Sequence, residues 1–109
     1  VMNVTGLTEE VRALTGLDHA ALTEAAGSVP VGSGGLVWLP FLLGERVPDL
    51  PEATGTLLGL RPGLLRPGHL YRAALEGVSL NLAAGLDRLR DLGLLVDEVR
   101  LVGGASGNR

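Results

Sequence analysis

The 109-residue chain contains no cysteine, which excludes a disulfide scaffold and any chemistry that needs a thiolate. It also lacks lysine, so its nine basic residues are all arginine, set against twelve acidic ones for a net charge of −3. The sequence has no cluster of basic residues that could bind the phosphates of a nucleic acid. No apolar run reaches membrane-spanning length, and no signal peptide is visible. We therefore expect a cytoplasmic protein that binds neither nucleic acid nor membranes.

The length and the hydrophobic pattern predict one α/β domain, or a piece of one, with helices packed on a small sheet. A chain of 109 residues can bury one core and is too short for two domains. It begins at Val1 and stops just after a glycine-rich turn. We therefore expect it to be part of a longer protein.

Two short, alanine-rich helices are predicted near the amino terminus. Thr8 can cap the first, which Gly16 ends, and Asp18 can cap the second, which Gly27 ends. Their apolar residues recur at helical spacing, which is typical of packing elements that cover a sheet. His19, on the second helix, has no predicted role.

Two apolar runs, residues 36–39 and 55–60, are predicted as strands, and Trp38 in the first is expected in the core. The loop between them carries Glu45 and Arg46, predicted as an exposed acid–base pair. A solvated pair of this kind contributes well under about 1 kcal/mol. If the pair lay at the mouth of a cleft, the guanidinium group of Arg46 would instead offer hydrogen-bond donors in a fixed planar arrangement, and Glu45 would orient it. The residues alone favour neither interpretation.

A long helix is predicted over residues 67–92, because Pro67 is suited to the first turn of a helix and Gly93 to the position just after its last residue. Apolar residues recur along it at three- and four-residue steps and predict a stripe that lies on the sheet: Leu75, Val78, Leu82, Leu86, Leu89 and Leu92. Arg72 and Glu76 are four residues apart and are predicted to pair. His69 is interpreted as bonding a nearby backbone group, since no second metal-binding residue stands at a suitable spacing.

The last apolar stretch, residues 98–102, alternates as a strand does and runs directly into Gly103, Gly104, Ala105, Ser106, Gly107 and Asn108. Consecutive glycines at the carboxyl end of a strand remove the Cβ atoms that would hold a ring or a phosphate away from the backbone. A glycine pair after a strand is nevertheless more often a plain turn than a nucleotide site. The residues alone therefore favour the plain turn.

Two motifs resemble the carboxy-terminal domain of the FGGY carbohydrate kinases, which are ATP-dependent sugar kinases of the actin-like fold. One is Gly44, Glu45 and Arg46 followed by Pro48. The other is a spaced signature of Gly55, Leu57, Gly59 and Leu60, then His69, Leu70, Ala73, Ala74, Leu75 and Glu76. The LPEATG run after the first motif resembles the xylulokinase branch of the family most closely. The resemblance covers nearly the whole chain.

The resemblance implies which residues meet the nucleotide. Family members contact ADP through a double-glycine turn and an Asn four residues after the second glycine, and this pattern falls here on Gly103, Gly104, Ala105 and Asn108. The third position is often glycine, so Ala105 is a small departure. The resemblance also implies an ordered loop at Glu45 and Arg46, near the cleft between the two lobes.

The resemblance further implies a kinase that uses ATP and Mg²⁺ to convert D-xylulose to D-xylulose 5-phosphate, and it allows a homodimer. The aspartate that acts as general base, and the hairpins that hold the phosphates and Mg²⁺, would lie outside this sequence, so no catalytic or metal-binding residue is assigned and the chain alone is expected to be inactive. Gluconokinase and ribulokinase are alternatives within the family. A non-catalytic actin-like nucleotide-binding module and an α/β interaction domain without a ligand are alternatives outside it.

Overall fold

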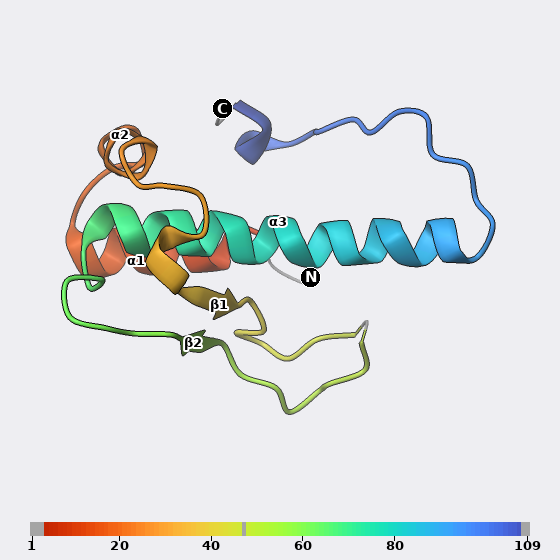
Figure 1. Cartoon of the computed structure of the whole chain (residues 1–109), viewed down its shortest axis with the longest axis horizontal. Helices are drawn as coiled ribbons and strands as arrows, with labels where there is room; N and C mark the ends of the chain where they lie inside the picture. Colours follow the sequence, from red (N-terminus) through yellow and green to blue (C-terminus); the bar gives the residue numbers. More distant parts are fainter. Residues whose placement is uncertain (1–3, 47, 108–109) are drawn as a thin grey trace.

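The computed structural model of the chain describes residues 4–46 and 48–107. Along the sequence its elements are α1 (Gly6–Thr15), α2 (His19–Gly27), the short 3-10 helix η1 (Ser33–Gly35), β1 (Val37–Leu39), β2 (Thr56–Leu58), α3 (Pro67–Asp91) and the 3-10 helix η2 (Gly104–Gly107). The long helix α3 runs through the middle of the molecule, and the other elements gather around its first half (Figure 1).

The two amino-terminal helices form where the sequence predicts, but they pack on α3 rather than covering the sheet as expected. The start of α1 also differs from the prediction. Thr5, not Thr8, occupies the N-cap position. The hydroxyl of Thr8 donates a hydrogen bond to the carbonyl oxygen of Thr5 at 2.8 Å. Thr8 is therefore buried inside the first turn, and its predicted role as the cap is wrong. Gly16 ends α1 with a φ of 71°, and the Asp18 carboxylate accepts the backbone N–H of Ala21 at 2.8 Å, as predicted.

The core lies between the first half of α3 and the two shorter helices. Its fully buried side chains include Tyr71, Leu7, Leu22 and Val11. Close approach to α3 depends on glycine. A Cβ at Gly68 would lie 2.6 Å from the carbonyl oxygen of Ala25 in α2. The small surface at Gly68 therefore lets α2 pack directly against the α3 backbone.

The sheet contains two antiparallel strands, with Trp38 opposite Leu57. Trp38 is half-buried and packs against the core. Both strands are shorter than the apolar runs that predicted them. Gly59 takes a φ of 78° and lies against the backbone of Gly35, so β2 ends before it.

The predicted strand over residues 98–102 is wrong for this structure, in which the segment forms no regular element. A strand is held by hydrogen bonds to a neighbour. Within the described part of the chain, β1 and β2 pair only with each other. The segment is therefore left extended, with Leu101 and Val102 at 76% and 84% exposure.

The apolar stripe of α3 is buried over only half its length. Val78 belongs to the core and Leu75 packs against it, but Leu82, Leu89 and Leu92 are exposed. The expectation that the whole stripe lies on the sheet is therefore wrong, because a sheet of two three-residue strands is too small to cover a helix of 25 residues.

The predicted pair on α3 is confirmed, with Arg72 Nε 2.9 Å from Glu76 Oε1. The same carboxylate oxygen accepts the backbone N–H of Gly32 at 3.0 Å. Nearby, the hydroxyl of the fully buried Ser33 donates to the carbonyl of His69 at 2.7 Å. These bonds fix the loop that leads into β1. The hydrogen bond at His69 is made by its carbonyl rather than its imidazole.

Candidate functional site

The glycine turn after residue 102 is an open stretch of backbone. Gly103 has a φ of 90°, and residues 104–107 form η2. Gly103, Gly104 and Gly107 are exposed, and a Cβ added at any of them would meet no described atom within 4 Å. Asn108, the other residue assigned to the nucleotide, lies outside the described residues. The turn thus presents main chain that a flat or charged ligand could approach closely.

The loop with Glu45 and Arg46 is folded more tightly than the sequence suggests. The backbones of Glu45 and Leu50 exchange two hydrogen bonds of 2.9 Å, which close the loop. Glu45 is only 3% exposed, and its Oε1 accepts the N–H of Arg46 at 2.8 Å. The predicted exposed pair is therefore wrong for Glu45, whose carboxylate turns back onto its own loop, while Arg46 is exposed. The position of the loop at a cleft stays a prediction.

The glycine turn and the loop at 44–46 are not brought together within this chain. They lie on opposite sides of α3, the turn near the label C and the loop below the helix (Figure 1). The glycine turn and the loop at 44–46 are therefore separate features of this chain.

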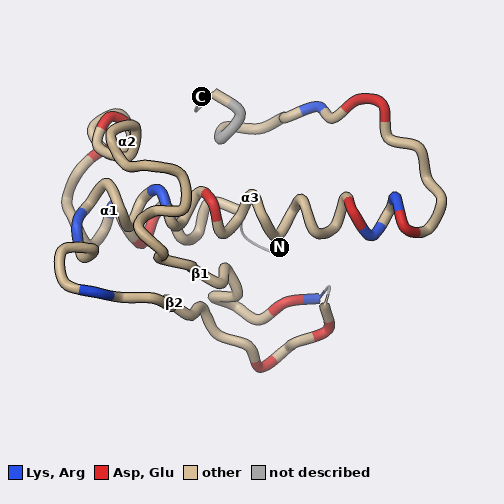
Figure 2. Tube along the Cα trace, viewed as in Figure 1, with Lys and Arg blue, Asp and Glu red and all other residues tan. Residues whose placement is uncertain are grey.

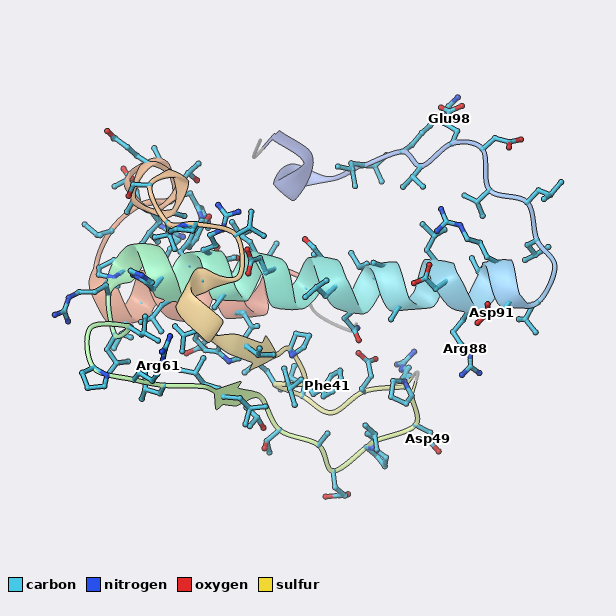
Figure 3. The ribbon with its side chains drawn as sticks, in the orientation of Figure 1. Phe41, Asp49, Arg61, Arg88, Asp91 and Glu98 are labelled. Atoms are coloured by element: carbon cyan, nitrogen blue, oxygen red, sulfur yellow. The ribbon has the colours of Figure 1, made fainter. Side chains whose placement is uncertain are left out.

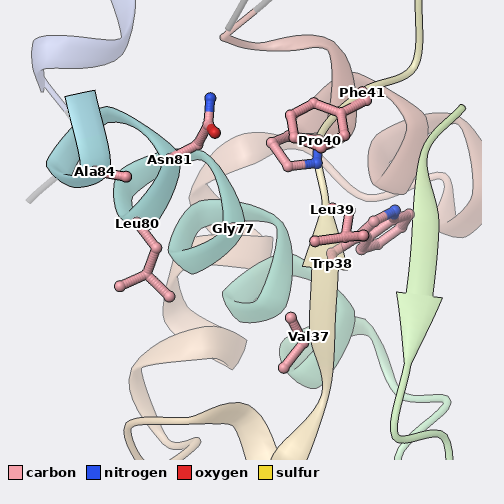
Figure 4. Close-up of a pocket in the computed structure, with 9 residues that line it drawn as sticks. All are labelled: Val37, Trp38, Leu39, Pro40, Phe41, Gly77, Leu80, Asn81 and Ala84. Carbon is pink, nitrogen blue, oxygen red and sulfur yellow. The ribbon is translucent and has the colours of Figure 1, made fainter. Parts of the chain in front are cut away.

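An apolar groove of about 230 Å³ lies between the end of β1 and the middle of α3 (Figure 4). The β1 side contributes the backbone and side chains that run from Val37 to Phe41, and α3 contributes Gly77, Leu80, Asn81 and Ala84. The groove offers one amide, on Asn81, and no ionisable side chain. The lining therefore suits packing of an apolar group rather than acid–base chemistry.

The structure reveals a polar network that sequence reasoning missed. A hydrogen bond of 2.8 Å joins His19 Nε2 to Glu9 Oε1, and a second of 2.8 Å joins His19 Nδ1 to the hydroxyl of Tyr71. Arg12 donates to the other Glu9 oxygen at 2.9 Å. The network links α1, α2 and α3 through partners 10 and 52 residues apart in sequence. No local sequence pattern predicts a contact between residues so far apart, so the role of His19 could not be predicted from the sequence.

Glu9 should make the stability of the protein depend on pH. Its hydrogen bond with His19 lowers the pKa of Glu9 below the ordinary value of 4.5; partial burial opposes this shift, and Arg12 lowers the pKa further. A pKa lowered by folding stabilises the folded state above the unfolded pKa, and this contribution is lost as the pH falls through the folded pKa. We expect Glu9→Gln to lower the unfolding temperature above pH 4.5, and we expect the difference to shrink as the pH falls below 4.5 through the lowered pKa of Glu9.

Thermal unfolding of both proteins across this pH range checks the expectation. Glu10→Gln is the control, since Glu10 is an exposed acid on the same helix and its loss should leave the pH profile unchanged. A Glu9→Gln protein that tracks the unaltered protein at every pH would show that the network contributes no stability.

Acidic and basic residues both occur at several places along the described chain (Figure 2). Among residues 4–46 and 48–107 there is no group of three or more His, Cys, Asp or Glu side chains that could hold a metal ion. In the same part of the chain, no helix has the length and apolarity needed to cross a membrane.

Comparison with known proteins places this architecture in a family. Residues 3–109 match the FGGY family of carbohydrate kinases, C-terminal domain. Xylulose kinase of Haemophilus influenzae is 37% identical over 106 residues, which cover 97% of this chain and 22% of that protein. Glycerol kinase of Ralstonia pickettii is 41% identical over 85 residues, which cover 76% of this chain and 17% of that protein.

The structural comparison agrees. The crystal structure of xylulose kinase from Bifidobacterium adolescentis matches with a TM-score of 0.89 and 29% identity, over 98% of this chain and 21% of that one. The expected α/β fold, part of an actin-like ATPase lobe, is thereby confirmed. The chain spans about a fifth of the length of the relatives it matches. It belongs to the FGGY family of carbohydrate kinases, by its C-terminal domain.

Proposed function

We propose that this chain is the nucleotide-side part of a longer ATP-dependent sugar kinase, here called the parent kinase, which converts D-xylulose to D-xylulose 5-phosphate. One observation carries the proposal: over 97% of its length the chain is 37% identical to a protein named xylulose kinase. The match between its fold and the xylulose kinase of Bifidobacterium adolescentis supports the same branch of the family.

The chain's own contribution is to receive the adenine nucleotide at Gly103, Gly104, Ala105 and Asn108. Three features support this assignment: the family pattern falls on these positions, the glycines that are described are exposed, and the space where their side chains would stand is open. Backbone N–H groups in such a turn can donate to an anionic ligand. A flat ring can lie against a main chain that carries no Cβ.

Phosphoryl transfer in the parent kinase would rest on positioning and on charge stabilisation. When bound, ATP with Mg²⁺ supplies the γ-phosphoryl group and neutralises the charge that develops on it. A sugar hydroxyl attacks the γ-phosphorus, the bond to the oxygen of ADP breaks, and an aspartate from the remainder of the polypeptide accepts the hydroxyl proton. Glu45, Arg46 and the glycine turn take no part in the proton transfer, and the chain alone is inactive.

The same proposal places the parent kinase in the cytoplasm, includes Mg²⁺ as a cofactor held by other parts of the polypeptide, and allows a homodimer. It includes no nucleic-acid or membrane partner. The inclusion of Mg²⁺ rests on the chemistry of the family, and no residue of this chain is proposed to bind it.

A sugar panel tests the proposal. We expect the purified parent kinase to consume ATP with D-xylulose at a kcat/KM at least about tenfold above that with gluconate, ribulose or glycerol, a difference of about 1.4 kcal/mol in transition-state binding. Glycerol is included because glycerol kinase of Ralstonia pickettii is also similar. Equal rates would contradict the xylulose assignment. Nucleotide binding without ATP consumption on any sugar would instead favour a non-catalytic module.

A further inference from the structure

Four consecutive residues between α2 and β1 have a left-handed backbone. These residues, called the connector, are Gly32, Ser33, Gly34 and Gly35, with φ values of 92°, 50°, 68° and 97°. Glycine adopts this conformation freely, but a residue with a Cβ adopts it at a cost. Within the described part of the chain, Ser33 is the only residue other than glycine with a positive φ. The connector is therefore strained at this one position.

Contacts with α3 hold the strained residue in place. Ser33 is fully buried, and its hydroxyl donates to the carbonyl of His69 in the first turn of α3 at 2.7 Å. One residue earlier, the backbone N–H of Gly32 donates to the Glu76 carboxylate at 3.0 Å. A strained backbone persists where the surrounding contacts impose it, and such residues cluster in regions that switch conformation. The bond from Ser33 to α3 therefore offsets strain that favours opening of the connector.

The chain that leaves β2 returns to the same connector. A Cβ on Gly59, just after β2, would overlap the carbonyl oxygen of Gly35. The guanidinium group of Arg61 donates to the carbonyl of Gly34, and its side chain reaches from the segment after β2 toward η1 (Figure 3). The chain therefore enters β1 and leaves β2 next to one another, at the connector.

We propose that the connector is a hinge on which β1 and β2 move as one unit against α1, α2 and α3. Hinges are short segments that absorb a change in φ and ψ, often at small residues, and all four connector residues are small. The structure described here is the closed state, in which the backbone of β1 packs on Gly77 of α3. Opening relaxes the backbone of Ser33 and breaks its bond to His69. The pairing of Trp38 with Leu57 keeps the two strands together.

Hydrogen exchange of the parent kinase tests the proposal with two substitutions at one position. Ser33→Ala removes the hydroxyl but keeps a Cβ on the left-handed backbone, whereas Ser33→Gly removes both the hydroxyl and the strain. We expect residues 32–36 to exchange at least about fivefold faster in Ser33→Ala than in the unaltered protein, because a buried hydrogen bond is lost. In Ser33→Gly this increase should be at least about threefold smaller, because relief of the strain favours the closed state.

The same experiment on the unaltered parent kinase tests whether the strands move as a unit. Residues 32–36 should exchange at least about tenfold faster than the paired amides of residues 37–39 and 56–58, because opening breaks the bonds of the connector and leaves the sheet paired. All rates are first divided by those of an unstructured chain of the same sequence. Equal rates in the connector and the strands would overturn the proposal, since the connector would then open only when the sheet unfolds.

Should Ser33→Ala fail to fold, Arg61→Ala takes its place, because Arg61 is exposed and bonds to the connector through its guanidinium group. We expect Arg61→Ala to speed exchange of residues 32–36 at least about threefold. Arg66→Ala is the control, since the guanidinium group of Arg66 bonds to the carbonyl of Leu65 instead, and it should leave this exchange unchanged.

Two further results would overturn the proposal. One is equal exchange of residues 32–36 in Arg61→Ala and Arg66→Ala. The other is an increase in Ser33→Gly as large as that in Ser33→Ala, because no strain would then be stored at Ser33. None of these measurements needs sugar or nucleotide, so a failure here is distinguishable from a failure of the sugar panel.

Discussion

Gly104→Val in the parent kinase is expected to weaken ADP binding at least about tenfold, which corresponds to about 1.4 kcal/mol. If the nucleotide lies against the bare backbone of the turn, a branched side chain at Gly104 fills the space that the nucleotide needs. Gly104 suits this test better than Gly103, because Gly103 has a φ of 90° and a substitution there would also strain the backbone. Calorimetric titration with ADP measures the effect.

The folded state should tolerate Gly104→Val, since a Cβ at that position meets no described atom within 4 Å. The unfolding temperature without nucleotide should therefore not change. Gly27→Val is the matched control, because Gly27 is also exposed with open space around it but lies at the end of α2, and it should bind ADP normally. Asn108→Ala should weaken binding as well. Unchanged affinity in both Gly104→Val and Asn108→Ala would remove the nucleotide assignment.

Gly77→Ala is expected to destabilise the parent kinase by about 1 to 2 kcal/mol. Replacing glycine by alanine inside a helix ordinarily stabilises by up to about 1 kcal/mol. At Gly77, however, the added methyl would overlap the backbone carbonyl of Trp38 in β1, and a backbone group cannot rotate out of the way. Forcing atoms into a packed contact typically costs about 1 to 3 kcal/mol. The steric cost should therefore outweigh the gain in helix propensity.

Thermal unfolding measures this effect, and Gly27→Ala provides the control with the opposite expectation. Gly27 is the last residue of α2 and has open space around it, so alanine there should leave stability equal or slightly raised. If Gly77→Ala unfolded at the same temperature as Gly27→Ala, the close packing of β1 on α3 described here would be incorrect.

The helices were predictable from sequence because their signals are local. Asp18 and Gly16 act as caps within one turn of the residues they serve, and the spacing of Arg72 and Glu76 predicts their pair directly. Local signals are less informative at the start of α1, where Thr5 and Thr8 can both cap and the hydrogen bond from Thr8 to Thr5 decides the outcome.

Features that depend on distant partners were not predictable. The alternation in residues 98–102 indicates a strand, but a strand forms only where another lies beside it. The leucine stripe of α3 predicts burial without saying what covers it. The burial of Glu45 depends on how the loop closes between Glu45 and Leu50, and the bond of His19 to Tyr71 joins residues 52 positions apart.

The candidate site was predicted only through the family resemblance, and it stays a prediction. On its own the run from Gly103 to Asn108 is indistinguishable from a plain turn, because its residues carry no charge that would identify a ligand. The described geometry is an exposed, open backbone, which suits a nucleotide as well as it suits solvent.

The most direct test of the central claim, that this glycine turn receives the nucleotide, is hydrogen exchange of the parent kinase with and without saturating ADP. The account predicts that ADP slows amide exchange at residues 103–107 by about tenfold or more, while residues 6–15 of α1 exchange at the same rate in both conditions. Exchange at residues 103–107 that is unchanged by ADP, at a concentration where titration shows the protein to be saturated, would contradict it.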